Sequence, residues 1–489
     1  MHDGDSATRS AALNGAALAT VAVGSAVQVI LYLHGFGATH FTDGMIAAVA
    51  VYSFVTTIAQ LLRTSAVPLI SGERQIVSNA AYGWTMAATA LAVTVICFAA
   101  APPLAHAVAG SAGSRGVGVA TTALRIMSAA IGLQVAGAAL SVVGAIHGRL
   151  NVVALAYAAS GIFGVAGYLV LQGDTGIQVL AWTNVVSAFV IVAVLVPSLR
   201  MRPVSPPNLR ALLAAASALF HSVPLPASFI FMYPVTLALA PAGVPGRVTL
   251  FGLAYTGCSY LAGFTAQALS MSEVVALSRS TAADSALRRV VVLRAFRYSL
   301  LLAAPGAAVA VVAGGPLVSA VMRARVGASG GQFGTDMTLL GPLLVATLGV
   351  WATLPAVLSV PDLMSRRRLF GAVLVLVAVH VLATLVGRAT FGFDGVVVAM
   401  AAAPLTFVFF SQYAVAPGAA RLLLRQAVTI CPAVVIVFGA LALLVKEAGL
   451  AGTAGEVAAA VVATLLYALL VRRLYPDEAR TLMRMVSNA

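Results

Sequence analysis

Long apolar segments alternate with short polar breaks along almost the whole chain. A helix needs about 20 apolar residues to cross a bilayer, and lipid cannot satisfy the hydrogen bonds of an open backbone. The pattern therefore predicts an all-α polytopic membrane protein with about fourteen transmembrane helices. The predicted segments are 11–33, 45–70, 78–108, 119–145, 150–172, 176–198, 209–240, 247–276, 291–320, 336–362, 368–390, 393–416, 424–446 and 453–475.

The composition agrees with this pattern. Of the residues, 61% are hydrophobic and 9% are charged, and the mean hydropathy is +1.02, which excludes an ordinary soluble domain. The formal charge of +14 would suggest nucleic-acid binding in a soluble protein. Here we attribute it to membrane topology and expect no nucleic-acid partner. The three cysteines lie in apolar segments without a CxxC pair, so we expect reduced thiols and no metal site.

The positions of Arg and Lys predict the orientation. With the N-terminus in the cytoplasm, twenty of the 28 basic residues fall in inner loops and tails, and six fall in outer loops. We therefore expect a plasma-membrane protein with both termini cytoplasmic, in the tails 1–10 and 476–489. The first ten residues make a poor signal peptide, so we expect the first apolar segment to be a true span. We interpret the basic runs at 288–289, 366–368 and 472–473 as topological anchors.

The two halves of the chain resemble each other weakly. Three pairs of short segments recur in order at equivalent points of the predicted topology. This predicts an N-lobe at 11–198, a C-lobe at 209–416 and two extra helices at 424–475, and parallel repeats of this kind frame a midplane site that opens alternately to each side. The pairs are "VPLIS" (67–71) with "VVALS" (274–278), "PLAHAV" (103–108) with "PLVSAV" (316–321), and "LSV" at 140–142 and 358–360.

No enzyme motif stands out. The chain lacks a P-loop, HExxH and GxSxG, and "GFGATH" (35–40) lies in a predicted loop without a preceding strand. The seven histidines are scattered. We therefore expect no enzyme and no cofactor, but a transporter driven by substrate supply, the membrane potential or an ion gradient.

Two basic residues, Arg63 and Arg125, fall inside predicted spans. One interpretation is that both snorkel to the interface, and the other is that they line a cavity and bind phosphate. Among the acids, Asp43 opens the second predicted span and is a further candidate for the substrate-binding cavity. Glu273 closes the eighth span, and we place the other twelve acids in loops or tails. The absence of a carboxylate deep in the predicted bundle favours an anionic cargo over cation exchange.

Other polar and helix-breaking residues are weaker candidates. We consider four glutamines for a sugar-binding wall, although each would serve equally as a helix–helix hydrogen bond. Arg149 in the "HGR" break is a topological anchor and, with Glu273, a candidate for the inner end of a gate. Prolines 224, 226 and 234 interrupt the seventh span, where a static kink and a moving bend fit equally well. The glutamines are Gln28, Gln60, Gln134 and Gln267.

Several segments, taken together and in order, resemble the lipid II flippases (the MurJ or MviN family). That family belongs to the superfamily of multidrug, oligosaccharidyl-lipid and polysaccharide (MOP) exporters. The likeness is dispersed over roughly 15–400. The segments are "FGATHFTDGMIAAVAV" (36–51), "SAVPLISGER" (65–74), "ALRIMSAAIGLQVAGAALSVVGAIHGRLNVVALA" (123–156), "VALSRSTAADSALRR" (275–289) and "GQFGTDMTLLGPLL" (331–344).

The resemblance implies a V-shaped bundle of two lobes and a polyprenyl-diphosphate-linked saccharide as cargo. Alternating access would move this lipid II-like precursor of peptidoglycan from the inner to the outer leaflet. Its head group would cross in a cationic central cavity, and its tail would stay in lipid beside the last two helices. The resemblance also implies a role in cell-wall biogenesis and cell shape. We expect a monomer whose partners are membrane lipids and cell-wall synthesis enzymes.

The chain departs from the family where cargo-binding arginines are expected. "TVAVGSAVQVILYLHGFGA" (20–38) carries no charge, and Gln28 falls where one arginine is expected. "YSFVTTIAQLL" (52–62) and "AYTGCSY" (254–260) replace further charged motifs. These departures suggest a different lipid-linked cargo. A multidrug or cation antiporter of the same superfamily and a non-transporting membrane scaffold remain as alternatives.

Overall fold

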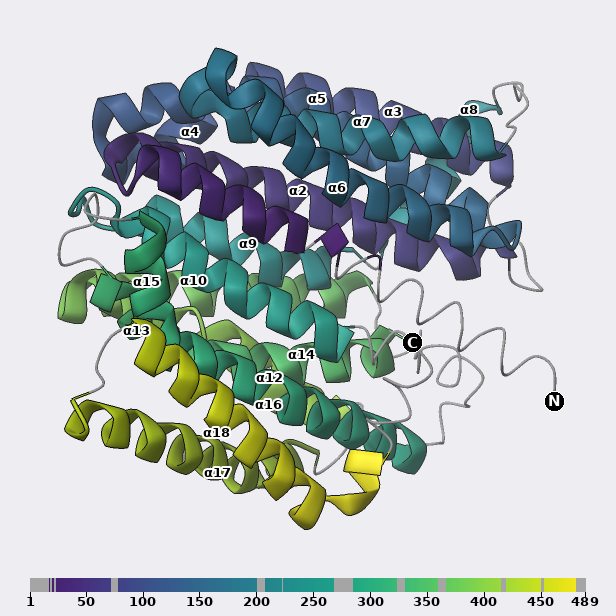
Figure 1. The fold of residues 1–489 in the computed structure, drawn as a ribbon. Helices are drawn as coiled ribbons and strands as arrows, with labels where there is room; N and C mark the ends of the chain where they lie inside the picture. The colour runs from purple at the N-terminus through teal and green to yellow at the C-terminus, as the bar shows by residue number, and fades with distance from the viewer. Residues whose placement is uncertain are drawn as a thin grey trace. The chain divides into compact units, whose positions relative to one another are not determined.

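The computed structural model is built from helices and the turns that join them. No strand occurs in the part of the chain it describes, which confirms the predicted all-α class (Figure 1). The described residues are 17, 20, 21, 23–71, 78–199, 207–221, 223–267, 285–322, 330–358, 366–414, 419–449 and 453–480.

Many of these helices are long and apolar enough to cross a bilayer. Eight described stretches meet this test, and up to ten do so if each of two bent pairs counts as one span. Every predicted apolar segment overlaps a described helix, the first being the shorter apolar helix Val23–Phe36. The multi-pass membrane class is thus supported, and the number fourteen stays a prediction.

Contacts divide the chain into two compact units, Met1–Thr249 and Leu250–Ala489. In unit 1, α5 is central, because it packs against α2, α3, α4 and α7 (Figure 1). After Val23–Phe36, the helices of unit 1 are α2 (His40–Ser71), α3 (Asn79–Ala99), α4 (Ala101–Ala109), α5 (Gly113–Ile146), α6 (Leu150–Thr175), α7 (Val179–Leu199), α8 (Leu209–His221) and α9 (Pro224–Leu239).

Glycines allow close helix crossings in unit 1. A Cβ placed on Gly44 of α2 would overlap the backbone of Gly116 of α5, and one on Gly24 would overlap the backbone of Gly161 in α6. Between membrane helices, packing rather than the hydrophobic effect stabilises association, so small residues at crossings let the backbones approach. These glycines thus let α2 approach α5 closely, and the helix Val23–Phe36 approach α6.

Prolines break two of the predicted spans in unit 1. The segment 78–108 divides into α3 and α4, and Pro102 opens α4, where a missing amide hydrogen costs nothing. The seventh span divides into α8 and α9, which are bent by 66°. Pro224 and Pro226 open α9 and Pro234 lies inside it, so the expected interruption is present.

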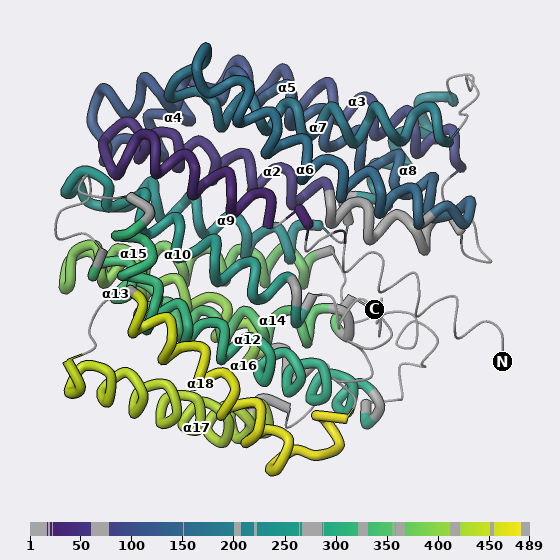
Figure 2. Tube along the Cα trace, in the orientation of Figure 1, coloured from purple at the N-terminus to yellow at the C-terminus, as the bar shows by residue number. Residues whose placement is uncertain are grey.

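Unit 2 is organised around α12, which packs against α13, α14, α17 and α18. Gly392, at φ 62°, reverses the chain within α15 and brings Gly387 against Gly395. The chain can be followed in Figure 2. The helices are α10 (Arg247–Ala262, whose first turn lies in unit 1), a π-helical turn (Gly263–Gln267), α12 (Ser285–Met322), α13 (Gly330–Leu339), α14 (Gly341–Leu358), α15 (Arg366–Ala399), α16 (Ala402–Ala414), α17 (Ala419–Glu447) and α18 (Thr453–Leu474).

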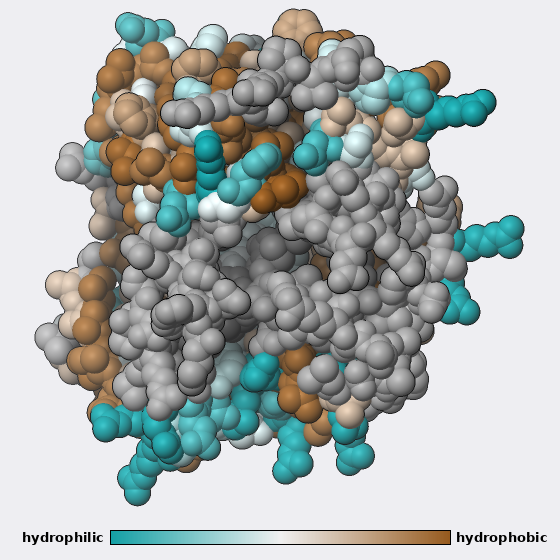
Figure 3. Space-filling view, turned by 90° about the vertical axis from the view of Figure 1, so that its right-hand side faces the viewer, coloured by the Kyte–Doolittle hydropathy of each residue, from teal (hydrophilic) through white to brown (hydrophobic). Residues whose placement is uncertain are grey.

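The border between the compact units lies later than the gap between the predicted lobes. Helices α8 and α9 belong to unit 1, because α8 packs on α2 and α3 and α9 packs on α2 and α4. The lobes 11–198 and 209–416 were drawn from sequence repeats and stay a prediction. In Figure 3 hydrophilic side chains project at several edges of the face, and apolar side chains gather at its upper left and along its left side.

Candidate functional site

Asp43 is the best-defined of the candidate residues. Its side chain lies in the first turn of α2 and is only 2% exposed. The carboxylate accepts hydrogen bonds from the Gly246 amide (2.7 Å), the Thr249 amide (2.8 Å) and the Thr249 hydroxyl (2.7 Å). These amides belong to the N-terminal turn of α10, whose free N–H groups and positive dipole end favour a carboxylate. Asp43 therefore caps a helix 203 residues away in sequence.

The turn that carries Asp43 is itself held by hydrogen bonds between threonine side chains and the backbone. The Thr39 amide donates to the Thr42 hydroxyl (2.8 Å) and the Thr42 amide donates to the Thr39 hydroxyl (3.3 Å), a reciprocal arrangement like a capping box. The Thr42 hydroxyl also lies 3.1 Å from that of Thr249. We call Thr39, Thr42, Asp43, Gly246 and Thr249 the α2–α10 junction. Its polar atoms are already engaged with one another, which favours a structural role for Asp43.

Arg125 has a different environment. Its side chain is exposed on α5, and its guanidinium lies 5.8 Å from the ring centroid of Phe98, in the last turn of α3. A cation near a helix C-terminus and over an aromatic face is favourable on both counts. Within the described part of the chain no carboxylate pairs with it, so its N–H groups remain accessible to a phosphate.

Two of the candidate glutamines lie at helix contacts. Gln28 is 7% exposed, and a Cβ on Gly164 of α6 would strike its amide nitrogen and the Ser187 hydroxyl oxygen of α7. Gln134 of α5 lies 3.4 Å from the Tyr52 hydroxyl of α2. Both placements match the helix–helix alternative, and the sugar-wall role of either residue stays a prediction.

Arg149 joins the end of one helix to another. It follows α5, where Gly148 has φ 70°, and its guanidinium donates to the carbonyl of Ser198 near the end of α7. An arginine at a helix C-terminus stabilises the free carbonyls there. This contact gives Arg149 an anchoring role, and its participation in a gate stays a prediction.

Four candidates lie outside the residues that the structure describes. These are the side chains of Gln60, Arg63 and Gln267, and the whole of Glu273. The prediction that Arg63 and Arg125 face one cavity is therefore not tested.

The sequence analysis missed a buried acid. Asp336 is fully buried in α13 (0% exposed), and its carboxylate lies 3.5 Å from the amide of Gln332, one helical turn earlier. The sequence analysis placed Asp336 among the loop and tail residues, and this was wrong. The tenth predicted span was drawn to begin at residue 336, whereas α13 already begins at Gly330 and therefore contains Asp336. The Gln332–Asp336 spacing of four residues was the available signal. His380 of α15 is also buried, at 1% exposure.

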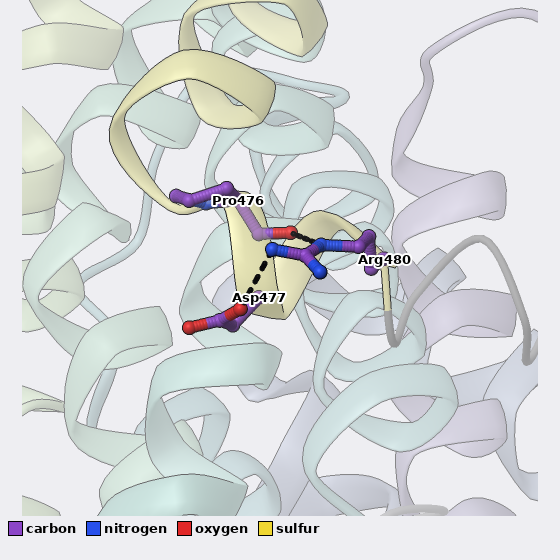
Figure 4. Close-up of polar contacts among 3 residues, drawn as sticks. All are labelled: Pro476, Asp477 and Arg480. Carbon is purple, nitrogen blue, oxygen red and sulfur yellow. Dashed lines mark hydrogen bonds and ion pairs between the residues drawn. The ribbon is translucent and has the colours of Figure 1, made fainter.

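A second polar contact, which we call the α12–tail clamp, lies in unit 2. Arg297 of α12 forms an ion pair of 2.7 Å with Glu478, and its guanidinium lies 4.8 Å from the ring centroid of Tyr475. The adjacent pair Arg480–Asp477 (3.1 Å) is much more exposed, and Arg480 also donates to the Pro476 carbonyl (Figure 4). The clamp holds the residues after α18 against α12.

The described residues contain no group of three or more His, Cys, Asp or Glu side chains arranged to hold a metal ion. The buried thiols of Cys97 and Cys258 are free.

No protein-family model and no curated protein sequence matches this chain. Solved structures do match. A lipid II flippase MurJ in an inward closed conformation has a TM-score of 0.70 at 12% identity, over 94% of this chain and 99% of that chain. The chain has the fold of MOP-superfamily transporters. An inward-facing MATE multidrug transporter of the MOP superfamily has a TM-score of 0.62 at 13% identity, over 84% of this chain and 98% of its own.

A further match is the MATE multidrug transporter DinF-BH, with a TM-score of 0.58 at 14% identity, over 82% of this chain and 92% of that chain. These structures are transporters, and the likeness at such low identity concerns the MOP fold. It confirms the superfamily fold that the sequence segments suggested.

Proposed function

We propose that this protein is a flippase that moves a polyprenyl-diphosphate-linked saccharide from the inner to the outer leaflet by alternating access. A lipid II-like precursor of peptidoglycan or a related cell-envelope glycolipid is the cargo class. The observation that carries the proposal is the match to the MurJ flippase over nearly the full length of both chains.

The extent of the match supports a flippase over a multidrug antiporter. The MATE structure is itself matched over 98% of its length, yet it leaves about a sixth of this chain unmatched. The MurJ structure matches 94% of the chain, so a fold of comparable length accounts for more of this protein.

The charges of the chain favour an anionic cargo. Arg63 and Arg125 are the two basic residues inside predicted spans, and the guanidinium forks of arginine suit phosphate oxygens. In this proposal Arg63 and Arg125 are the candidate phosphate contacts, and both termini lie in the cytoplasm. The missing cavity arginines noted above favour a cargo other than the one carried by MurJ.

A multidrug or cation antiporter is the second candidate, because Asp336 is the kind of buried carboxylate that such exchange requires. Asp43 is less suited to exchange, since its oxygens already accept three hydrogen bonds. The antiporter hypothesis therefore rests on Asp336 in unit 2.

Depletion of the protein followed by lipid analysis separates these functions. We expect one polyprenyl-linked saccharide to accumulate on the inner leaflet, with unchanged efflux of cationic dyes. Unchanged lipids together with slower dye efflux would replace the flippase by the antiporter, and no change in either would favour a scaffold.

Complementation identifies the residues involved. We expect Arg63→Gln to restore transport poorly and Arg74→Gln, a matched change in the predicted inner loop, to restore it fully. Asp336→Asn should leave lipid transport intact. Loss of lipid transport in Asp336→Asn alone would indicate proton or cation coupling at that carboxylate.

A further inference from the structure

Three packed helices of unit 2, α12, α17 and α18, bring one end of each together (Figure 1). The Tyr467 hydroxyl of α18 donates to the Leu301 carbonyl of α12 at 3.3 Å. One turn before Leu301, Arg297 pairs with Glu478, which follows α18. Because the later residue of α12 contacts the earlier residue of the α18 segment, the two helices are antiparallel. The start of α12 therefore lies beside the end of α18.

The start of α17 lies at the same place. Only five residues separate α17 from α18, and packed helices joined by so short a connection are antiparallel. A cavity of about 60 Å³ is lined by Leu301 of α12, Thr429 of α17 and Val471 of α18, among others. Four exposed arginines, which we call the basic end of unit 2, lie within three turns of these lining residues. They are Arg421 and Arg425 of α17 and Arg472 and Arg473 of α18.

The acids of the described chain do not neutralise the basic end. Asp477 and Glu478 lie nearby, but each already pairs with another arginine, in the α12–tail clamp and beside it. Glu447 and Glu456 lie at the opposite ends of α17 and α18. Within the described residues no ion pair engages any of the four arginines. The basic end therefore presents four positive charges that an external anion can reach.

On α17 the arginines share one face with an exposed apolar stripe. Residues three, four or seven positions apart lie on the same face of a helix. From Leu424 to Leu444 this face extends for about 30 Å at the helical rise per residue, which is about the thickness of the hydrocarbon core of a bilayer. Arg421 and Arg425 are thus at the level of lipid head groups. The exposed apolar residues of the stripe are Leu424, Val428, Val435, Ile436, Leu443 and Leu444.

Helix α18 repeats this arrangement in the opposite chain direction. Its exposed Leu465 and Leu469 lead at helical spacing to Arg472 and Arg473 in the last turn. A helix C-terminus favours such cations, but Arg421 lies in the first turn of α17, where the positive end of the helix dipole disfavours one. Helix stability therefore does not account for Arg421. Membrane topology depends on how many basic residues a loop carries, and it does not require them to continue an apolar stripe.

We propose that the basic end of unit 2 binds the phosphate head group of an anionic bilayer phospholipid, whose acyl chains lie along the exposed stripes of α17 and α18. Arginine forks form charge-assisted hydrogen bonds with phosphate oxygens, and basic sites between membrane helices suit lipid head groups. A soluble anion would account for the arginines but not for the apolar stripe that continues from them. The site does not depend on which cargo the protein carries.

Photo-crosslinking tests the lipid site. The full-length protein is placed in phosphatidylcholine nanodiscs that contain a trace of phosphatidylglycerol with a diazirine in one acyl chain, irradiated and digested. We expect lipid adducts in peptides covering 424–444 and 461–473. Phosphatidylcholine carrying the same diazirine should give far fewer adducts there, because it has no net charge. Equal yields from the two probes would overturn the proposal, since the stripes would then contact lipid without selecting its head group.

Neutral variants test the arginines. Arg421→Gln/Arg425→Gln should lower the phosphatidylglycerol adducts about 25-fold, because each arginine beside an anionic head group contributes a factor of about five. The matched control is Arg367→Gln/Arg368→Gln, which removes two exposed charges from the start of α15 and should leave these adducts unchanged. Equal loss in both double variants would assign the effect to the overall charge and overturn the site.

A second pair of arginines keeps the test decisive. Should Arg421→Gln/Arg425→Gln fail to fold, Arg472→Gln/Arg473→Gln removes the other half of the basic end, with the same expected loss. Unchanged adducts in a folded variant of either pair would overturn the proposal. The lysine variant Arg421→Lys/Arg425→Lys should retain most adducts, since it keeps both charges at the head-group level.

Competition identifies the source of the phosphate. Unlabelled phosphatidylglycerol in excess should displace the probe, whereas inorganic pyrophosphate, which has no acyl chain, should not. Displacement by pyrophosphate would assign the arginines to a soluble anion. A polyprenyl-diphosphate saccharide should displace the probe no better than an equal amount of phosphatidylglycerol. Complete displacement by that amount would assign the basic end to the cargo of the proposed function. Either of these two results would overturn the bilayer phospholipid as the ligand.

Discussion

Two polar contacts fasten helix ends in this protein, and they differ in how water reaches them. In unit 1 the α2–α10 junction buries a carboxylate at 2% exposure and surrounds it with three hydrogen-bond donors. In unit 2 the α12–tail clamp pairs Arg297 with Glu478 at side-chain exposures of 35% and 17%. In the junction the carboxylate accepts hydrogen bonds from the amides of the first turn of α10, which have no partner within that helix. In the clamp two opposite charges pair with each other, and water can also solvate both of them.

This difference changes what a charged residue in a membrane protein signifies. Asp43 looks functional from its position, yet its oxygens are committed to the first turn of α10. Arg125 looks like a snorkelling residue, yet its guanidinium is exposed beside an aromatic ring. Whether the polar atoms of a residue are already engaged is a better guide to ligand binding than its depth.

The largest effect should come from removing the carboxylate of the junction. Asp43→Ala leaves two buried amides without an acceptor, at about 1–3 kcal/mol each, so we expect a loss of about 2–6 kcal/mol in the free energy of unfolding. Denaturant titration in detergent micelles measures this loss. Asp43→Asn is the control that keeps the volume and one acceptor oxygen, and it should lose less. Equal stability of all three proteins would contradict the capping role.

Gly246→Ala should weaken the same junction through the backbone. Gly246 has φ 85°, and a Cβ there would strike Ala38. A non-glycine residue in this region costs about 1–2 kcal/mol before any clash, so we expect a loss of about 1–3 kcal/mol in the same titration. Gly243→Ala is the matched control, since Gly243 has a more open setting. If Gly243→Ala lost more free energy of unfolding than Gly246→Ala, the loop before α10, and not the cap on α10, would be the part of the chain that tolerates no added side chain.

The sequence predicted the fold well and the junction poorly. Apolar segments locate helices because lipid leaves the backbone no other choice, and the prolines before Pro234 marked the α8–α9 break. The partner of Asp43 lies 203 residues away, and no local pattern encodes such a pairing. Asp336 was missed for a related reason, because hydropathy assigns a charged residue at a segment edge to the loop.

The clamp should respond less than the junction, and it should respond to salt. Glu478→Gln removes a partly exposed ion pair, for which we expect about 0.5–1 kcal/mol at low ionic strength after screening by solvent. The loss should shrink at high salt, where the screening length falls to a few ångströms, whereas that of Asp43→Ala should not. A salt-dependent Asp43→Ala effect would remove the distinction between the two contacts.

The smallest effect belongs to the pair beside the clamp. Arg480 and Asp477 lie three residues apart, with side-chain exposures of 67% and 86%, so their attraction is weakened by water and offset by the entropy of two free side chains. We expect Asp477→Asn to leave the melting temperature within experimental error. Glu478→Gln, one residue further, should lower it measurably. Because both changes remove one negative charge from the same short helix, the difference between them isolates burial. Equal shifts would show that net charge near the C-terminus, and not the contact with Arg297, stabilises this end of unit 2.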